Sequence, residues 1–406
     1  MIVFVTDELP RPDAAGHLAL NYAILSWLRA EGHEVVILLT GMRLVSAVER
    51  YDLVRLTGPH ILRVGPYVTP SSPIAAARTL ARQMLRRLPA PFAARLHRRR
   101  NKADAVLGGF PSADDLRWCA RAIARLRPHA VLIDTIFRAP LLSEPELAGR
   151  NSVLITHDLF YRRAEALRAA GYTVRPETLT RDREAKLLEQ AGHIAAIQPE
   201  EAALLREMCP ATDIFITPMP ALPCPPPSQT RRIAGRLVFV GSDSLPNLDG
   251  LRWFFSEIWP ELRGHGLTLD LIGDCGPALR RRLPPEIVVH GRVRNLAPLL
   301  HRAALAISPL RTGSGLKIKM LDYARHGLFT IATPPSLQGF DISPNAPFIM
   351  AGSAGMFALA ILRHAAAPPP PEQALAYVIS QYGVESAFAS LKAALAPARG
   401  KRLTEA

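Results

Sequence analysis

The sequence has 406 residues, is 49% hydrophobic and 21% charged, and carries a formal net charge of +14. This length predicts two or three domains, and the composition is that of an ordinary globular protein rather than a disordered or fibrous one. No apolar run approaches the roughly 20 residues that span a bilayer, so an integral membrane protein is not expected.

The cysteines give no sign of a disulfide framework or a metal site. They are far apart, with no CxxC pair and no Cys/His spacing, at Cys119, Cys209, Cys224 and Cys275. We therefore expect a reducing cytoplasm, no bound metal and no cofactor.

Short apolar runs alternate with helical patterns along the first half of the chain. The first run begins almost at residue 1, without the basic region that opens a signal peptide. A helix is predicted over 18–31, and strands are predicted over 2–6, 34–40, 130–134, 152–156 and 193–198. This alternation predicts a mostly parallel sheet with helices on both faces. At the strand ends we expect Asp7 and Asp134 to be turn or cap residues, and Asp158 to cap the following helix.

Residues 77–102 form a dense basic cluster in which arginines alternate with leucine, methionine and phenylalanine. The pattern is compatible with a pair of basic amphipathic helices at an anionic membrane surface. The alternative is a solvated helical face whose apolar side packs on its own domain. No nucleic-acid-binding motif accompanies the cluster and aromatics are few near it, so we expect no nucleic-acid partner.

A proline-dense segment, TPMPALPCPPPSQT at 217–230, separates two series of strands and helices. Beyond it, helices are predicted over 247–263 and 295–303, and one helix or a pair over 373–396. Strands are predicted over 236–241, 267–273, 286–291, 304–308 and 329–333. The predicted fold is α/β, with two doubly wound Rossmann-like domains facing a cleft. The expected domains are 1–217, a linker at 218–232, 233–370, and a C-terminal helix and tail at 371–406.

The segment PLRTGSGLKIKMLDYARHG, residues 309–327, predicts an anion site. A glycine turn leads into a helix, whose N-terminal N–H groups and dipole suit a phosphate or diphosphate. Lys317 and Lys319 add positive charge, and Asp322 can accept hydrogen bonds from sugar hydroxyls. Alternatively, the lysines are solvated and Asp322 forms a surface pair with Lys319. Gly327 is placed to end the helix.

Three ordered pieces of the second half carry a resemblance to a known family. They are LVFVGSDSLPNLDGLRWFFSEIWPEL, then LTLDLIGDCGPAL with IVVHGRVRNLAPLLHRAALAISPLRTGSG, then GLKIKMLDYARHGLFTIAT. They resemble the first strand and helix, the base-binding region and the donor-binding helix of the retaining group 1 glycosyltransferases, family four, which have the GT-B fold. The close resemblance covers residues 236–341, and VFVTDELPRPDAAGH and SVLITHD carry a looser one in the first half.

The resemblance implies roles for individual residues. Asp322 matches the carboxylate that holds the nucleotide ribose, and Ser314 stands where many members have a glutamate that touches the transferred sugar. The Arg/Lys pair that many members use for the diphosphate is missing, and the two lysines of the motif are its substitutes. His157 matches a catalytic histidine near the anomeric carbon, although it is also explained as a structural strand-end residue. The donor-binding residues implied are Gly16, Gly241, Ser242, Arg292, Val293, Arg294, Ser314, Gly315, Leu316, Lys317, Lys319 and Asp322.

The resemblance implies a retaining, metal-independent glycosyltransferase that moves a hexose from a nucleotide diphosphate sugar to a lipid-linked or polysaccharide acceptor. With the basic cluster, it implies a cytoplasmic enzyme peripheral to the inner face of the plasma membrane. Two alternatives remain open at this point. One is a nucleotide-sugar epimerase of the same fold, and the other is a non-catalytic paralogue at the membrane surface.

Overall fold

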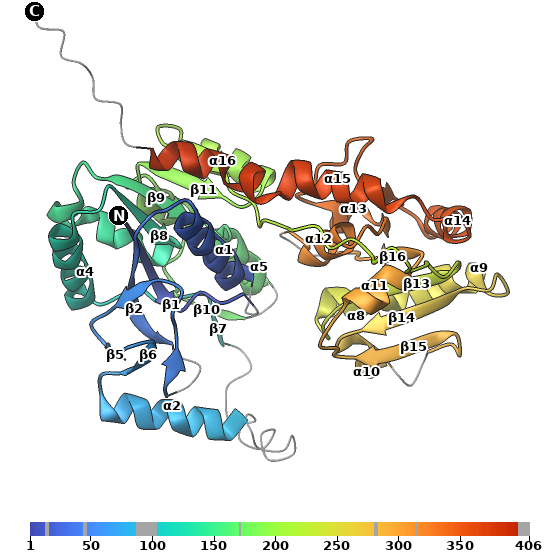
Figure 1. The fold of residues 1–406 in the computed structure, drawn as a ribbon, viewed down its shortest axis with the longest axis horizontal. Coiled ribbons are helices and arrows are strands. Elements are labelled where there is room, and N and C mark those ends of the chain that lie inside the picture. The colour runs from blue at the N-terminus through green and yellow to red at the C-terminus, as the bar shows by residue number, and fades with distance from the viewer. Residues whose placement is uncertain are drawn as a thin grey trace, which may run out of the picture. The chain divides into compact units, whose positions relative to one another are not determined.

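The computed structural model divides the chain into two compact units (Figure 1). The first comprises Met1–Met219 together with Phe388–Ala406, and the second comprises Pro220–Ala387. The structure describes residues 1–12, 16–43, 47–86, 104–169, 172–279, 283–312 and 316–396. Within these ranges, no helix is long and apolar enough to cross a membrane.

A parallel sheet forms the centre of the first unit. Its strand order is β12-β11-β9-β8-β1-β2-β4. The strands are β1 (Ile2–Glu8), β2 (Val35–Arg43), β4 (Arg55–Thr57), β8 (Ala130–Asp134), β9 (Asn151–Ile155), β11 (His193–Ala196) and β12 (Asp213–Ile216). Successive residues of β1 are fully buried. Because successive side chains point to opposite faces of the sheet, both faces are covered by other parts of the protein at this strand.

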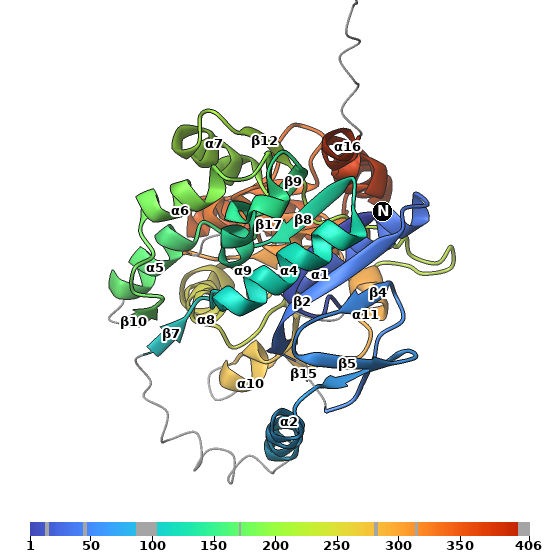
Figure 2. The same cartoon turned by 90° about the vertical axis from the view of Figure 1, so that its left-hand side faces the viewer.

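Helices connect these strands, as the alternation predicted. The α-helices are α1 (Gly16–Ala30), α4 (Ala113–Leu126), α5 (Phe160–Ala169), α6 (Arg181–Leu188) and α7 (Pro199–Met208), and the 3-10 helices are Ile136–Ser143 and Pro145–Leu147. Figure 2 shows α4 in front of the strands of this unit. The strands predicted over 2–6, 130–134, 152–156 and 193–198 are confirmed within one or two residues, and the strand predicted over 34–40 is confirmed but ends three residues later, at Arg43.

A small antiparallel sheet, which the sequence analysis did not predict, leads into the basic cluster. It has the order β3-β6-β5 and is followed by helix α2. The elements are β3 (Glu49–Arg50), β5 (Ile61–Val64), β6 (Tyr67–Pro70) and α2 (Pro73–Arg86), and two further short strands, β7 (Asp104–Val106) and β10 (Thr173–Arg175), pair with each other. Residues 87–102 of the basic cluster lie outside the described residues.

The last helix, α16 (Val384–Leu395), returns to the first unit from Phe388 onward. The ring of Phe388 lies 5.0 Å from that of Trp27 on α1. Asn151 Nδ2 donates a hydrogen bond to the carbonyl of Ala394 at 2.8 Å, and Lys392 pairs with Glu31. The first unit is therefore built from two separate stretches of sequence.

The second unit has its own parallel sheet, of order β15-β14-β13-β16-β17-β18. The strands are β13 (Arg236–Val240), β14 (Thr268–Ile272), β15 (Ile287–Gly291), β16 (Leu305–Ser308), β17 (Thr330–Ala332) and β18 (Phe348–Met350). The helices are α8 (Leu245–Trp253), a π-helical turn (Phe254–Ile258), α9 (Trp259–Leu262), α10 (Cys275–Leu279), α11 (Ala297–Arg302), α12 (Ile318–Arg325), α13 (Pro334–Leu337), α14 (Ala354–Ala365) and α15 (Pro371–Tyr382). The expected fold of two doubly wound Rossmann-like domains is thus confirmed.

Each sheet has a switch point, where the strand order reverses. In the first unit it lies between β1 and β8, and in the second between β13 and β16. Open parallel sheets bind ligands beyond the carboxyl ends of the strands at such points. The loops that follow these four strands are therefore the places to look for a site.

Candidate functional site

Helix α12 follows β16 and is held against the end of β13. The phenolic oxygen of Tyr323, which is fully buried, accepts a hydrogen bond from the backbone N–H of Val240 at 2.7 Å. Burial raises the pKa of Tyr323. Gly327 has a φ of +75° and follows His326, the residue that caps the end of α12, as predicted. Ser314 and Gly315, which precede the helix in the sequence, lie outside the described residues.

Lys319, in the first turn of α12, points toward the loop after β13. Its Nζ donates a hydrogen bond to Asn247 Oδ1 at 2.7 Å and lies 4.2 Å from the centre of the Phe239 ring. Burial and the neighbouring Lys317 lower the pKa of Lys319 to about 7. An ammonium group has three N–H donors. A ligand can therefore use the donors that Asn247 does not occupy.

Burial also lowers the pKa of Lys317, the residue that precedes α12. Leu316 and Lys317 are both half-buried. Since the first N–H groups of a helix have no partners within it, they and the two lysines concentrate positive charge at this end of α12.

The loop after β13 begins at Gly241, one of the implied donor-binding residues. A Cβ placed on Gly241 would lie 2.6 Å from the Phe239 ring and 3.0 Å from Asn247 Nδ2, so only glycine fits there. Gly273, after β14, has a φ of +97°, and a Cβ there would lie 2.3 Å from the Gly241 carbonyl oxygen. Asn247 Nδ2 in turn donates to the carbonyl of Ser242 at 3.1 Å. Asn247 thus joins this loop to Lys319.

The segment after β15 contains Arg292, Val293 and Arg294. The Arg292 guanidinium is exposed and forms an ion pair with Asp274, which follows β14. Arg292 Nε and Nη2 both donate hydrogen bonds to Asp274 Oδ2, at 2.8 and 2.5 Å. Arg294 is also exposed, whereas Val293 is half-buried. The structure therefore places the implied base-binding segment after the strand that neighbours β14, on the same carboxyl edge of the sheet as Gly241.

Asp322 lies in the second turn of α12, and its side chain is one-third exposed. Its carboxylate Oδ1 is 3.8 Å from Arg325 Nε, and burial raises its pKa. Lys319 bonds Asn247 instead, so the interpretation of Asp322 as a surface partner of Lys319 is wrong. The backbone oxygen of Asp322 accepts a hydrogen bond from His326 Nδ1 at 2.7 Å.

In the first unit, His157 follows β9 and bonds a buried carboxylate at the end of β8. His157 Nε2 lies 2.9 Å from Asp134 Oδ1, and Thr6 donates its hydroxyl to Asp134 Oδ2 at 2.6 Å. Burial alone would raise the pKa of Asp134, but the bonds from His157 and Thr6 lower it to about 2. The prediction of Asp134 as a turn or cap residue is therefore wrong, because both its oxygens accept side-chain hydrogen bonds.

The loop after β1 and the start of α1 lie beside this pair. Gly16 is the first residue of α1, and the next residue, His17, stacks edge-on with His157 at 5.7 Å between ring centres. Burial and the positive potential of His157 lower the pKa of His17. Asp7, also predicted as a turn or cap residue, instead pairs with the buried Arg138, whose Nη1 lies 2.5 Å from Asp7 Oδ1.

The start of α5 is capped differently from the prediction. Glu184, from α6, accepts the backbone N–H groups of Phe160 and Tyr161 at 3.0 and 2.6 Å. Asp158 pairs with Arg163 at 3.2 Å. A side chain that is distant in sequence therefore accepts the free N–H groups at the start of the helix. The local spacing of residues around α5 does not indicate this contact.

Comparison with known proteins matches residues 234–366, which hold β13 to α14, to the family described as glycosyl transferases group 1. Over these residues the chain is similar to the group 1 glycosyl transferases. The expected resemblance is thus confirmed for the part of the chain that contains Gly241, Arg292, Lys319 and Asp322.

Solved structures share the fold over nearly the whole chain. Sucrose-phosphate synthase from Thermosynechococcus elongatus is 14% identical, with a TM-score of 0.60 and 97% of each chain covered. A glycosyltransferase from Rickettsia africae ESF-5 is 11% identical, with the same TM-score and coverage. These likenesses confirm the GT-B fold.

A curated relative in Klebsiella pneumoniae is described as an uncharacterized 44.6 kDa protein in a cps region. It is 23% identical over 141 residues, and the match spans 32% of this chain and 36% of that protein.

In the first unit, helix α2, which contains the start of the basic cluster, carries exposed apolar side chains. Ile74 and Leu80 of α2 are 66% and 47% exposed, and Arg78 lies exposed between them. The neighbouring hairpin exposes Val64, paired with Tyr67 across β5 and β6. The start of α2 and the hairpin before it therefore expose apolar side chains together with basic ones.

Proposed function

We propose that this protein transfers a hexose from a nucleotide diphosphate sugar to a lipid-linked or polysaccharide acceptor, with retention at the anomeric carbon. The observation that carries the proposal is the bond from Lys319 to Asn247. It joins the loop after β13 to the N-terminus of α12 at the switch point of the second unit.

This arrangement suits a departing diphosphate. Glycosyl transfer places negative charge on the leaving nucleotide, and positioned cations with helix N–H groups stabilise such charge. Lys317, Lys319 and the start of α12 supply both, so the proposed transfer step needs no divalent ion. Asp322 is proposed to accept hydrogen bonds from the ribose, and Arg292 to Arg294 to border the nucleobase.

His157 is proposed to contact the sugar near its anomeric carbon. Asp134 is a carboxylate at neutral pH and can only accept a hydrogen bond. Nε2 of His157 therefore carries a hydrogen and donates it to Asp134. In the neutral ring Nδ1 then has a lone pair and accepts a hydrogen bond from a sugar hydroxyl. In the proposed retaining reaction, the leaving phosphate removes the acceptor proton, which requires exclusion of water more than a strong protein base.

A membrane-bound acceptor is proposed from the surface of the first unit. The exposed apolar residues of α2 and the β5–β6 hairpin lie beside arginines, a combination that binds anionic lipid. We therefore propose that the enzyme works at the inner face of the plasma membrane.

The donor proposal is tested by incubating the protein with UDP-, GDP- and dTDP-sugars and measuring binding and slow donor hydrolysis. Binding of one nucleotide series with release of the free sugar supports it, and binding of none overturns it. Conversion of the sugar nucleotide without acceptor into an isomer would instead identify an epimerase.

The membrane proposal is tested by flotation with vesicles that contain an anionic lipid, against neutral vesicles. We expect Val64→Asp to reduce binding, whereas Leu359→Asp, equally exposed on α14 of the second unit, leaves it unchanged. Equal binding of both variants and the wild type contradicts docking through this surface.

A further inference from the structure

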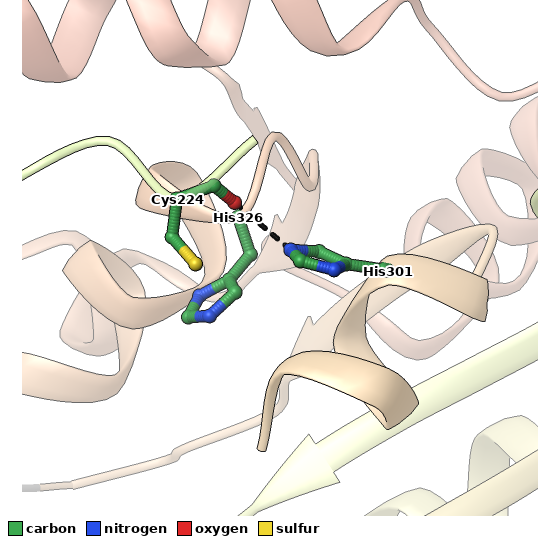
Figure 3. A group of neighbouring side chains, drawn as sticks. All are labelled: Cys224, His301 and His326. Atoms are coloured by element: carbon green, nitrogen blue, oxygen red, sulfur yellow. Dashed lines mark hydrogen bonds between the residues drawn. The ribbon is translucent and has the colours of Figure 1, made fainter. Parts of the chain in front are cut away.

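Three side chains that are distant in sequence meet in the second unit (Figure 3). Cys224 lies on the proline-rich segment, His301 on α11 and His326 directly after α12. One candidate ligand atom from each lies within 4.8 Å of the other two. Both histidines are buried, at 6% and 3% exposure, and Cys224 is partly exposed. The pattern has no sequence signature, because the three positions are far apart along the chain.

Backbone carbonyls hold both imidazoles in place. His301 Nε2 donates to the carbonyl of Cys224 at 2.8 Å, and His326 Nδ1 donates to that of Asp322 at 2.7 Å. A carbonyl only accepts, so each of these nitrogens carries a hydrogen and the other ring nitrogen has the lone pair. The N–H of Cys224 donates to the carbonyl of Arg325 at 2.7 Å, which fixes the cysteine beside the end of α12.

Histidines that bind metal characteristically donate their other ring N–H to a carbonyl or carboxylate, as His326 does here. Its Nε2 is the nitrogen available to an ion. His301 has two routes, since binding through Nδ1 keeps its bond to Cys224, whereas binding through Nε2 exchanges that bond for the ion. Figure 3 shows the Cys224 sulfur beside the His326 ring and the bond from His301 to the Cys224 carbonyl.

We propose that Cys224, His301 and His326 bind one Zn²⁺ ion. A thiolate and two imidazoles form a ligand set that zinc prefers, with water as the fourth ligand. Zinc bond lengths place tetrahedral ligand atoms about 3.5 Å apart. The candidate ligand atoms, which lie within 4.8 Å of one another, therefore have to approach each other by roughly 1 Å. Rotation of the three side chains can bring them to this distance. The partly exposed Cys224 gives the ion and its water access.

The ion would fasten the proline-rich segment to the ends of α11 and α12. Because a ligand that binds the folded state adds to its stability, zinc should stabilise the second unit. This site is separate from the proposed transfer chemistry. Its test therefore does not depend on the donor, the acceptor or any measured activity.

The experiment titrates the chelator-treated full-length protein with Zn²⁺ against a chromophoric chelator, and with Co²⁺ as a spectroscopic probe. We expect one Zn²⁺ per chain and a thiolate-to-cobalt charge-transfer absorption. Cys224→Ser should abolish that absorption and weaken zinc binding at least tenfold, and His326→Gln should weaken zinc binding similarly. Cys209→Ser, which removes a buried cysteine of the first unit, is the matched control and should bind as the wild type does.

A second measurement uses only the wild type, in case a variant fails to fold. Zn²⁺ should slow alkylation of Cys224 by iodoacetamide at least tenfold, as read by mass spectrometry of the Cys224 peptide. The proposal is overturned if cobalt gives no thiolate absorption, if Cys224→Ser binds zinc as tightly as the wild type, or if zinc leaves the alkylation rate unchanged.

Discussion

Lys319 Nζ donates a hydrogen bond to Asn247 Oδ1 at 2.7 Å, and this bond joins the first turn of α12 to the loop after β13. Two segments 72 residues apart are thereby held at one switch point of the sheet. The ammonium is thus positioned before any ligand arrives, which reduces the ordering cost of binding an anion.

The first prediction concerns the charge of Lys319. Lys319→Met should weaken binding of the nucleotide sugar by about 1–3 kcal/mol, because a hydrogen bond between charged groups is lost. Isothermal titration calorimetry measures the change. Lys186→Met removes an exposed lysine of α6 in the first unit and should bind as the wild type does. If Lys319→Met folds and binds equally well, Lys319 is not a diphosphate ligand.

The second prediction concerns pH. Since burial lowers the pKa of Lys319 to about 7, the ammonium form is dominant below pH 7 and disappears as pH rises. The diphosphate diester of a nucleotide sugar keeps its charge in this range. Wild-type donor affinity should therefore fall by up to roughly tenfold per unit above pH 7, with proton uptake on binding. The slope should vanish in Lys319→Met, and a slope that survives there must come from another group.

The third prediction concerns Asp322. Asp322→Ala should weaken donor binding by about 1–3 kcal/mol if the carboxylate accepts hydrogen bonds from the ribose. The wild type should bind the 2′-deoxynucleotide weakly, and Asp322→Ala should bind it with nearly the same affinity as the wild type. This result would distinguish a contact with the ribose hydroxyl from a general effect of the negative charge of Asp322. Asp182→Ala, at an exposed position of α6, serves as the control. Unchanged affinity in a folded Asp322→Ala protein removes Asp322 from the site.

The fourth prediction concerns the stability of the first unit. The pKa of Asp134 is lowered from 3.8 to about 2, so its hydrogen bonds stabilise the fold above pH 4 and are lost as pH falls through 2. Asp134→Asn should lower the free energy of local unfolding at pH 7 by about 2 kcal/mol. Hydrogen exchange of peptides from β8 and β9 measures it. Wild type and variant should converge in stability toward pH 2, and a constant difference would contradict the assignment.

The fifth prediction separates catalysis from structure at His157. His157→Gln keeps a donor toward Asp134 but loses the imidazole lone pair, so kcat should fall about 100-fold or more while the KM for the donor changes little. Asp134→Asn should lower kcat less, because it acts through the orientation of the ring. A histidine with a merely structural role would show reduced thermal stability with kcat unchanged.

Much of the framework could be predicted because buried parallel strands are short continuous apolar runs. Residues 130–134 and 236–240 show this, and the structure places both in the sheets. The glycine that ends α12 was likewise readable, since a helix C-terminus commonly needs a positive φ. The domain pattern follows from these local signals.

The contacts between distant residues could not be predicted. Asp134 receives a hydroxyl from Thr6, 128 residues away, and Glu184 caps a helix more than 20 residues before it. Such pairs depend on how strands are ordered in the sheet, and one sequence does not show that order. For the same reason, four scattered cysteines argued against a metal site, although the fold brings one of them to two histidines.

The return of α16 to the first unit has a practical consequence for dissecting the protein. The second unit, Pro220–Ala387, is one continuous stretch, whereas the first needs residues from both ends of the chain. A fragment ending at Met219 would leave Trp27 without its Phe388 neighbour and Glu31 without Lys392. Truncation at Met219 would therefore destabilise the first unit. We expect a protein that joins 388–396 to 1–219 through a short flexible peptide to restore it.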